Sequence, residues 1–390
     1  MKTKTSRKLD EGGFSRLTAR AKQIASTRRG LKERPDWAAE VPQQVGIKMN
    51  NHCNLRCKHC FEWNDDGYHH QLSKSERGDE VSLAIVKKLL KSTEVSNAPF
   101  YLWGGEPLMY RNMKGLMDLL EQDPRWVTIC TNGLLIDKHL DELKRIDDHL
   151  ALLISLDGLE EDNDAIRGKG VFKRVQQTIE NLLRLREENQ FAGKISLCLT
   201  ISDHTIGKLY DFVSYFSHLG IDSIYMVFPW YIPKNVAEEM DVWVRENLPW
   251  KQKKLAATNE YSWHGYTYHI SPENIPALLK DIQRITDETW ACRVRFHPNL
   301  DESEVERFVK GSTHPAENKT FCTAIRNRLD VLPNGDVSSC KFFPELDVGN
   351  LQLIPLKDVW HGQAYQAFRK QLHCGLMPVC SKCTLLYSTG

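Results

Sequence analysis

Three cysteines near the start of the chain have the residue type and the spacing to do chemistry. Cys53, Cys57 and Cys60 form a Cys-x3-Cys-x2-Cys pattern within MNNHCNLRCKHCFEW. Three thiolates on one loop can hold three corners of a 4Fe-4S cluster, and the missing fourth protein ligand leaves one iron open to a small molecule. A zinc site is the alternative, but structural zinc prefers four protein ligands, and His52 or His59 would be strained as the fourth. We therefore predict an iron-sulfur cluster with one open iron on this loop.

A glycine pair followed by a carboxylate comes next, in the sequence WGGEP at residues 103–107. Gly104 and Gly105 let the backbone approach a ligand closely and leave N–H and C=O groups free to bind it. Glu106 adds a carboxylate, and Pro107 ends the motif. On its own, this pattern also fits an ordinary turn between a strand and a helix.

Further polar residues follow two later apolar runs. They stand in Thr131-Asn132-Gly133, in Ser155-Leu156-Asp157-Gly158 and at Arg167. Ser155 and Asp157 are two positions apart, so both can point to the same side of a strand, and the guanidinium of Arg167 can bind a carboxylate through two hydrogen bonds. A helix N-cap is the alternative role for Asp157. Helix caps alone would not explain why polar residues recur at successive strand ends after a cysteine triad.

The elements that must position these residues follow from hydrophobic periodicity. Short apolar runs predict six strands, at 45–49, 100–103, 126–130, 151–156, 195–201 and 223–228. Apolar residues at three- and four-residue intervals predict helices at 81–92, 113–121, 136–146, 171–189 and 206–219. This alternation implies an α/β fold, with a parallel sheet closed fully or partly into a barrel. The chemistry then belongs at the carboxyl ends of the strands.

In this order, the motifs resemble those of the radical SAM superfamily. The resemblance covers roughly residues 44–230, with a second region at 320–385. It implies a partial (β/α)6 TIM-like barrel in which the cysteine triad binds a 4Fe-4S cluster and S-adenosylmethionine (SAM) binds at the open iron. Glu106 is expected to bind the SAM ammonium group. The cofactor-binding set that the resemblance implies is Phe61, Gly104, Gly105, Glu106, Pro107, Thr131, Asn132, Ser155, Asp157, Arg167 and Leu199.

The reaction that the resemblance implies is reductive cleavage of SAM. An electron from a reductant such as flavodoxin or ferredoxin would give methionine and a 5′-deoxyadenosyl radical, which abstracts a hydrogen atom from the substrate. The cofactors supply this chemistry, and the protein orients them and excludes water.

Five more cysteines lie after residue 320: Cys322, Cys340, Cys374, Cys380 and Cys383. The segment between the first two contains a hairpin signal at Asn334-Gly335. This region resembles the SPASM/twitch extension, a small hairpin-plus-helix iron-sulfur domain. The resemblance implies one auxiliary 4Fe-4S cluster held by Cys322, Cys340, Cys380 and Cys383, because four thiolates saturate a cluster. A four-thiolate zinc ribbon is the alternative, although it would usually show two close cysteine pairs.

The remaining cysteines have weaker claims to a function. Cys292 and Cys374 could return a hydrogen atom to a substrate radical, and Cys374 could instead replace one of the four cluster ligands. A free, partly buried thiol is the simpler interpretation. Cys130 and Cys198 fall within predicted strands and are expected in the core.

Composition sets the class of protein. The chain has 390 residues, of which 41% are hydrophobic and 26% charged, so it can bury a sizeable core. The longest apolar runs have about five residues, far fewer than the roughly eighteen of a membrane span, and no secretory signal is visible. Eleven cysteines in tight clusters favour metal or iron-sulfur binding over disulfides. We expect a soluble cytoplasmic protein without a membrane partner.

Charge divides the chain unevenly. Residues 1–34 contain eleven Lys and Arg against three Asp and Glu, a net charge of +8 that leaves −7 for the rest. We expect a basic extension at 1–43, a barrel at 44–230, a linker or insertion at 231–319 and the auxiliary-cluster domain at 320–390. The basic extension could meet an acidic partner, a leader peptide or nucleic acid, but a solvated arm or frayed helix is simpler.

The predicted function is the modification of a ribosomally made peptide, by a cross-link or a related oxidation. The auxiliary cluster and the basic arm favour it, whereas 43 residues before the barrel are few for a leader-binding domain. The alternative is an oxidoreductase or epimerase acting on a sugar, aminocyclitol or nucleoside, which the short one-cluster extension favours. A non-enzymatic iron-sulfur or zinc protein is a third alternative, against which Glu106 and the ordered motifs argue, and a nucleic-acid partner is not expected.

Overall fold

A central mixed sheet organises the protein. The computed structural model describes residues 1–251, 260–311 and 319–389, and within them ten strands form one sheet in the order β12-β11-β10-β2-β3-β4-β5-β6-β7-β9. Every pairing from β10 through to β9 is parallel, and the pairings of β11 are antiparallel. The predicted α/β fold with a parallel sheet is confirmed.

The six predicted strands are present, each with ends within one residue of the expected positions. They are β2 (Gln44–Lys48), β3 (Phe100–Trp103), β4 (Val127–Thr131), β5 (Leu150–Ser155), β6 (Lys194–Thr200) and β7 (Ser223–Val227). On β5, the alternating residues Leu150, Leu152 and Ile154 are fully buried. The other face of this strand is only partly buried, because it turns toward the interior of the barrel.

Four further strands make the sheet larger than the predicted six. They are β9 (Arg293–His297), β10 (Arg328–Val331), β11 (Asp336–Ser338) and β12 (Asp347–Asn350). The hairpin expected around Asn334-Gly335 is confirmed as β10–β11. β9 lies in the region expected to be a linker or insertion, which also includes residues 252–259 and 312–318, outside the described residues. Its alternation of polar residues with Val294 and Phe296 spans only five residues, too few to stand out from the charged sequence around it.

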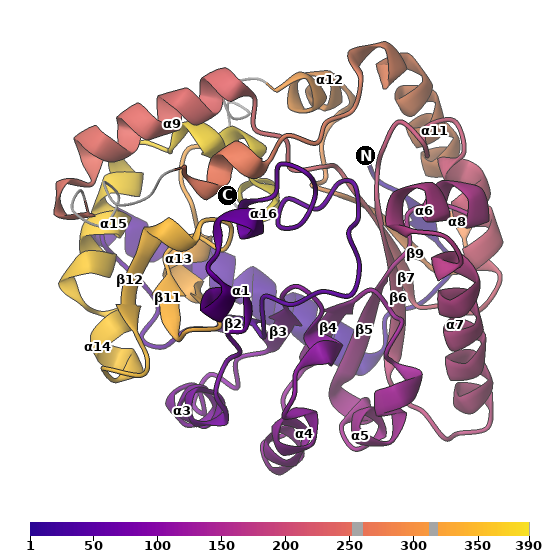
Figure 1. Ribbon diagram of the computed structural model, residues 1–390, viewed down its shortest axis with the longest axis horizontal. Helices are drawn as coiled ribbons and strands as arrows, with labels where there is room; N and C mark the ends of the chain where they lie inside the picture. Colours follow the sequence, from indigo (N-terminus) through magenta and orange to yellow (C-terminus); the bar gives the residue numbers. More distant parts are fainter. Residues whose placement is uncertain (252–259, 312–318, 390) are drawn as a thin grey trace.

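Helices cover the outer face of the sheet, which forms an open arc in Figure 1. Those between the predicted strands are α3 (Leu83–Ser92), α4 (Met113–Gln122), α5 (Leu140–Lys144), α7 (Val171–Glu187) and α8 (Leu209–Ser217). On α7, the fully buried Val175, Ile179 and Leu182 recur at four- and three-residue spacing, as on a one-sided helix. α5 is shorter than the predicted helix at 136–146, because residues 137–139 form a separate 3-10 turn.

The other described α-helices belong to loops, to the region after β7 and to the C-terminal part. They are α2 (Lys74–Arg77), α6 (Glu160–Arg167), α9 (Lys234–Asn247), α11 (Ile275–Asp287), α12 (Glu302–Lys310), α13 (Ala324–Asn327), α14 (Leu356–Trp360), α15 (Gln363–Cys374) and α16 (Thr384–Thr389). Figure 1 shows α14 and α15 beside β11 and β12. The C-terminal part is therefore an extension of the barrel sheet.

The basic N-terminal segment packs against the rest of the chain, whereas a solvated arm or frayed helix was expected. β1 (Lys4–Thr5) pairs with β8 (Thr289–Trp290), and α1 (Glu11–Glu33) is a helix of 23 residues. The carboxylate of Asp10 caps α1 by accepting a hydrogen bond from the backbone N–H of Gly13 at 2.6 Å. The Arg16 guanidinium lies 3.8 Å from the ring centroid of Trp126, just before β4.

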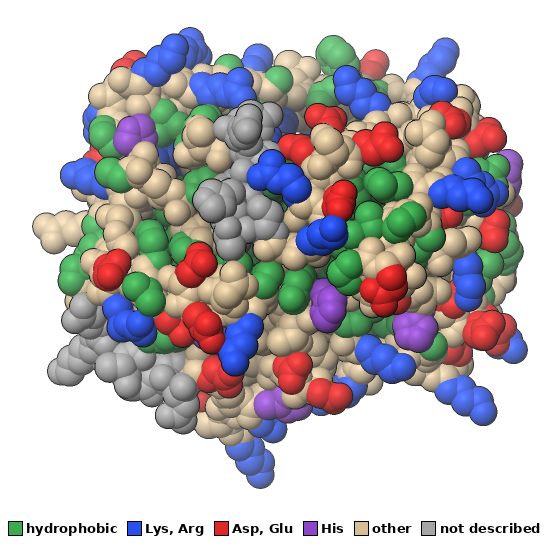
Figure 2. Space-filling view, turned by 90° about the horizontal axis from the view of Figure 1, so that it is seen from above, with side chains coloured by type: hydrophobic (Ala, Val, Ile, Leu, Met, Phe, Trp, Pro, Cys, Tyr) green, Lys and Arg blue, Asp and Glu red, His purple; other side chains and the backbone are tan. Residues whose placement is uncertain are grey.

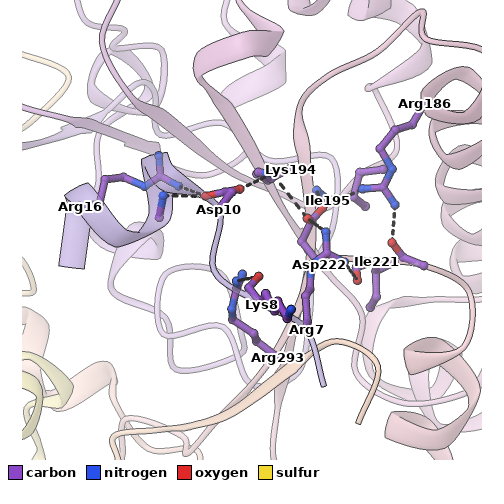
Figure 3. Close-up of polar contacts among 12 residues, drawn as sticks. Arg7, Lys8, Asp10, Arg16, Arg186, Lys194, Ile195, Ile221, Asp222 and Arg293 are labelled. Atoms are coloured by element: carbon purple, nitrogen blue, oxygen red, sulfur yellow. Dashed lines mark hydrogen bonds and ion pairs between the residues drawn. The ribbon is translucent and has the colours of Figure 1, made fainter. Parts of the chain in front are cut away.

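Asp222 anchors this segment, as Figure 3 shows. Its buried carboxylate pairs with Arg7, lies 2.8 Å from the Arg186 guanidinium and accepts a hydrogen bond from the backbone N–H of Ile195 at 2.8 Å. Lys194 reaches the same carboxylate at 4.0 Å. Because Asp222 directly precedes β7 and Lys194 begins β6, the N-terminal segment is held at the amino ends of the strands.

The outer surface mixes both signs of charge on the face seen in Figure 2, which looks onto α9, α11 and α12 from the top of Figure 1. Lys and Arg side chains are interspersed there with Asp and Glu. Within the described residues, no helix is both long enough and apolar enough to cross a membrane.

Candidate active site at the carboxyl ends of the strands

A cavity of about 260 Å³ lies at the carboxyl ends of the barrel strands. The Cys53, Cys57 and Cys60 thiols, which the sequence selects as cluster ligands, lie in its wall. Other predicted residues that line the cavity are Phe61, Gly104, Gly105, Glu106, Thr131, Asn132, Ser155 and Arg167. The parallel sheet thus brings together loops that are more than a hundred residues apart in sequence.

The glycine pair holds the loop that carries the cysteines. The Gly105 N–H donates to the carbonyl of Asn50 at 3.1 Å, and the Glu106 N–H donates to the carbonyl of His52 at 2.6 Å. A Cβ atom on Gly105 would lie 2.0 Å from that His52 oxygen, so only glycine fits. The motif after β3 therefore fixes the segment that leads directly into Cys53.

Glu106 is a buried carboxylate at the centre of the site, 1% exposed. It accepts hydrogen bonds from the Thr131 hydroxyl at 2.7 Å, the Asn132 N–H at 2.8 Å and the Leu108 N–H at 3.0 Å. Burial raises the pKa of Glu106, although these hydrogen bonds oppose the shift. A carboxylate offers about four acceptor positions, so one remains for an ammonium group in the cavity.

Asp157 lies beneath the cavity wall and does not line the cavity. Its Oδ2 lies 2.6 Å from both Arg167 Nε and His59 Nε2, and its Oδ1 accepts from the Thr200 N–H at 2.8 Å. Burial alone would raise the pKa of Asp157, but Arg167 and His59 hold it below its ordinary range. The prediction placed Asp157 among the residues that touch the cofactor. Its observed contacts instead orient Arg167 and His59, which do line the cavity.

Two other predicted cofactor residues lie outside the cavity wall. Leu199 is fully buried, because its neighbours Cys198 and Thr200 on β6 take the face that lines the cavity. Pro107 begins the 3-10 turn after Glu106 and is also buried. Both residues pack the strand ends that carry the site.

Several residues of the cavity wall were not predicted as site residues. Cys130 and Cys198 were expected in the core but line the cavity, because they alternate with the buried residues of β4 and β6. Their positions, one residue before the end of β4 and two residues before the end of β6, are the signal that could have found them. Trp230 and Lys341, which follows Cys340 directly, also line the cavity.

The C-terminal thiols form a second group. Cys322, Cys340, Cys380 and Cys383 line one cavity of about 50 Å³. Three residues line this cavity and the first one: Trp230, Tyr266 and Lys341. The two cysteine groups are therefore separated by a shared wall of side chains.

Cys292 and Cys374, the two candidate hydrogen donors, line neither cavity. Cys292 is fully buried just before β9, and this burial raises its pKa to about 11. Arg7 and Asp222 act on it electrostatically, so it lies at the amino ends of the strands. Cys374 is exposed at the end of α15. Neither thiol lines the cavity in which a substrate radical would form.

The donor sets fit iron-sulfur clusters. Burial raises the pKa of Cys53 to about 12 and also raises that of Cys57, so these thiols become ligands when a metal displaces their protons. His59, considered above as a fourth zinc ligand, is bound to Asp157. Three thiols suit an open cluster and four suit a closed one.

Comparisons with known proteins agree with this arrangement. Residues 47–213 match the radical SAM superfamily, and residues 322–384 match the SPASM family, an iron-sulfur cluster-binding domain. The chain is 26% identical over 354 residues to the serine-type anaerobic sulfatase-maturating enzyme of Bacteroides thetaiotaomicron, covering 86% of this chain and 78% of that protein. It is 31% identical over 195 residues to the mycofactocin maturase MftC of Mycobacterium ulcerans, covering 49% of this chain and 48% of that protein.

A solved structure shares the fold. The crystal structure of Streptococcus suis SuiB bound to precursor peptide SuiA superposes with a TM-score of 0.59 and 14% identity, covering 95% of this chain and 74% of that chain. The two matched regions contain the cysteine triad and the four C-terminal thiols that the structure gathers at its two cavities. The chain therefore belongs to the radical SAM superfamily: it is an enzyme that uses a 4Fe-4S cluster and SAM, with a SPASM iron-sulfur domain at its C-terminus.

Proposed function

We propose that this enzyme modifies a ribosomally made peptide by forming a cross-link or a related oxidation. The observation that carries the proposal is the wall formed by Trp230, Tyr266 and Lys341, which lines both cysteine cavities. A substrate group in the larger cavity would lie against the residues that border the C-terminal thiols. That position suits a substrate radical that passes an electron to an auxiliary cluster, and such an electron transfer makes the overall reaction an oxidation.

The relatives support a peptide substrate. The longer of the two sequence matches described above is to a sulfatase-maturating enzyme, and the shared fold includes SuiB, which was solved with a precursor peptide. The mycofactocin maturase matches about half of the chain. A small sugar, aminocyclitol or nucleoside substrate is the alternative, and the experiment below distinguishes the two.

The cysteines are assigned to the two clusters by position. Cys53, Cys57 and Cys60 would hold the cluster that binds SAM. Cys322, Cys340, Cys380 and Cys383 would hold one auxiliary 4Fe-4S cluster. Glu106 would accept the SAM ammonium group, and Arg167, oriented by Asp157, would face the SAM carboxylate.

When bound, the cluster and SAM supply the abstraction of a hydrogen atom from the substrate. The chain holds these groups in place and excludes water. Phe61 stacks on Tyr266 with ring centroids 4.6 Å apart and on Trp230 at 5.3 Å. This aromatic stack begins one residue after Cys60, so it shields the cluster side of the cavity from solvent.

The test is anaerobic reconstitution followed by incubation with SAM, dithionite and short peptides encoded beside the gene. We expect 5′-deoxyadenosine and a peptide that has lost a pair of hydrogen atoms, both detected by mass spectrometry. Cys53→Ala should abolish both products, because it removes a ligand of the open cluster. Cys374→Ala, which changes an exposed thiol outside both cavities, should leave both unchanged.

Two results would count against peptide modification. One is 5′-deoxyadenosine production that no peptide stimulates. The other is stimulation by a sugar or nucleoside from a neighbouring pathway, which would establish the alternative substrate class.

A further inference from the structure

Lys341 holds a cation inside the enzyme at the boundary between the two cysteine cavities. It follows Cys340 directly and lines both cavities. Cavity residues from separate elements surround it: Tyr101 and Trp103 come from β3, and Trp230 comes from the loop after β7. The lysine is therefore placed where a substrate group would reach it.

Aromatic rings surround the amine. Lys341 Nζ lies 4.6 Å from the ring centroid of Tyr101, 5.2 Å from that of Trp103 and 5.5 Å from that of Trp230. The ring of Phe342 lies at 5.7 Å. Ring faces attract a cation, but they do not accept the strong directed hydrogen bonds that an ammonium group makes to a carboxylate.

Lys341 makes no hydrogen bond or ion pair within residues 1–251, 260–311 and 319–389. Asp330, the carboxylate that acts on it electrostatically, is already bound by Arg328 at 2.7 and 2.8 Å. A charge taken out of water normally finds a partner. Because Lys341 lines the larger cavity, an anion that enters this cavity would provide such a partner.

Two more donors in the same wall lack an acceptor. The indole N–H groups of Trp103 and Trp230 are buried, and neither has a hydrogen-bond partner in the described part of the chain. Both tryptophans line the larger cavity and place a ring beside the lysine. One ammonium group and two indole N–H groups form a donor set that suits a carboxylate, which can accept several hydrogen bonds.

We propose that Lys341, with Trp103 and Trp230, binds a carboxylate of the substrate, such as an acidic side chain of the peptide beside the residue that is modified. This inference rests on the proposed function for the peptide part of the substrate. The inference adds a rule of substrate specificity: the enzyme selects a substrate with an acidic group and holds that group between the two clusters. SAM also has a carboxylate, so the experiment must distinguish the two sources.

The test is calorimetric titration of the reconstituted, SAM-loaded holoenzyme with two blocked tripeptides, acetyl-Gly-Glu-Gly-amide and acetyl-Gly-Gln-Gly-amide. We expect the acidic tripeptide to bind at least about tenfold more tightly, as a charged hydrogen bond contributes. Lys341→Met should remove this preference, and Lys341→Arg should keep most of it. Iron content is measured for each variant to show that both clusters are present.

Three results would overturn the proposal. If the wild-type enzyme binds the two tripeptides equally, or binds neither, the cavity does not select a carboxylate. If Lys341→Met keeps the preference, another residue is responsible. If Lys341→Met mainly weakens SAM binding, the carboxylate is that of the cofactor. A preference for the acidic tripeptide in an enzyme that modifies no peptide would contradict only the proposed function.

Discussion

Asp157 illustrates how a residue outside the cavity can control its wall. It is fully buried and binds Arg167 and His59 through one oxygen while the other accepts from the Thr200 N–H. Its spacing from Ser155 predicted that both would face the cofactor. The two-residue spacing predicted which side of the strand the two side chains face. It could not show that Arg167, at the end of α6, would lie against the Asp157 carboxylate.

We predict that Asp157→Asn weakens SAM binding about tenfold, because a neutral amide cannot form the ion pairs that orient Arg167 and His59. SAM affinity of the reconstituted enzyme, measured by equilibrium dialysis, tests this. The matched control is Asp162→Asn on α6, the helix that carries Arg167, since Asp162 pairs with Lys208, whose side chain is 53% exposed. Equal SAM affinities for Asp157→Asn and the wild-type enzyme would contradict the orienting role.

At the scale of elements, the N-terminal segment differs most from expectation. Its composition indicated a basic arm in solvent, yet α1 and β1 pack at the amino ends of the strands. The reason is that the partners of this segment lie far along the chain. Arg7 forms an ion pair with Asp222, and the Asn327 side-chain amide donates a hydrogen bond to the Thr27 hydroxyl at 2.6 Å. Local sequence does not carry such long-range contacts. Strands β2 to β7 were predictable, because their apolar alternation is local.

We predict that Asp222→Asn lowers the free energy of unfolding by about 2 kcal/mol, because it leaves two arginines without their carboxylate. The estimate is below that for a fully buried pair, since the Arg7 and Arg186 side chains are 29% and 26% exposed. Urea unfolding followed by circular dichroism measures the change.

The control for this experiment is Asp10→Asn. Asp10 pairs with Lys194 at 2.8 Å but is 48% exposed, so its loss should change stability by less than about 1 kcal/mol. If the two variants were equally stable, Asp222 would not be the anchor of the segment.

At the scale of the whole molecule, one ten-stranded sheet carries both cysteine sites. The sequence motifs identified seven of the nine cysteines that line the two cavities, because their spacing is unusual and their chemistry is specific. They did not reveal the shared wall of Trp230, Tyr266 and Lys341. That wall forms because a loop after β7, the region before α11 and the C-terminal hairpin come together in the fold. No local sequence pattern predicts these long-range contacts.

The two-site arrangement predicts about eight irons per chain after reconstitution, roughly four for each 4Fe-4S cluster. Substituting all four of Cys322, Cys340, Cys380 and Cys383 by Ala should leave about four irons and preserve the signal of the open cluster. Iron and sulfide analysis with electron paramagnetic resonance measures both. Cys374→Ala is the control and should retain the full content. Full iron content in the fourfold variant would exclude these thiols as cluster ligands.

The pairing of β10 with β2 has a consequence for how the protein is made. Arg328 lies opposite Gln44 in that parallel pair, so β2, which pairs with β3 along its other edge, gains its second neighbour only after most of the chain has left the ribosome. Until then β2 has one unpaired edge, open to association with other chains. Such distant contacts also slow folding. A nascent chain of this enzyme would therefore depend on chaperones until its C-terminal domain has been synthesised.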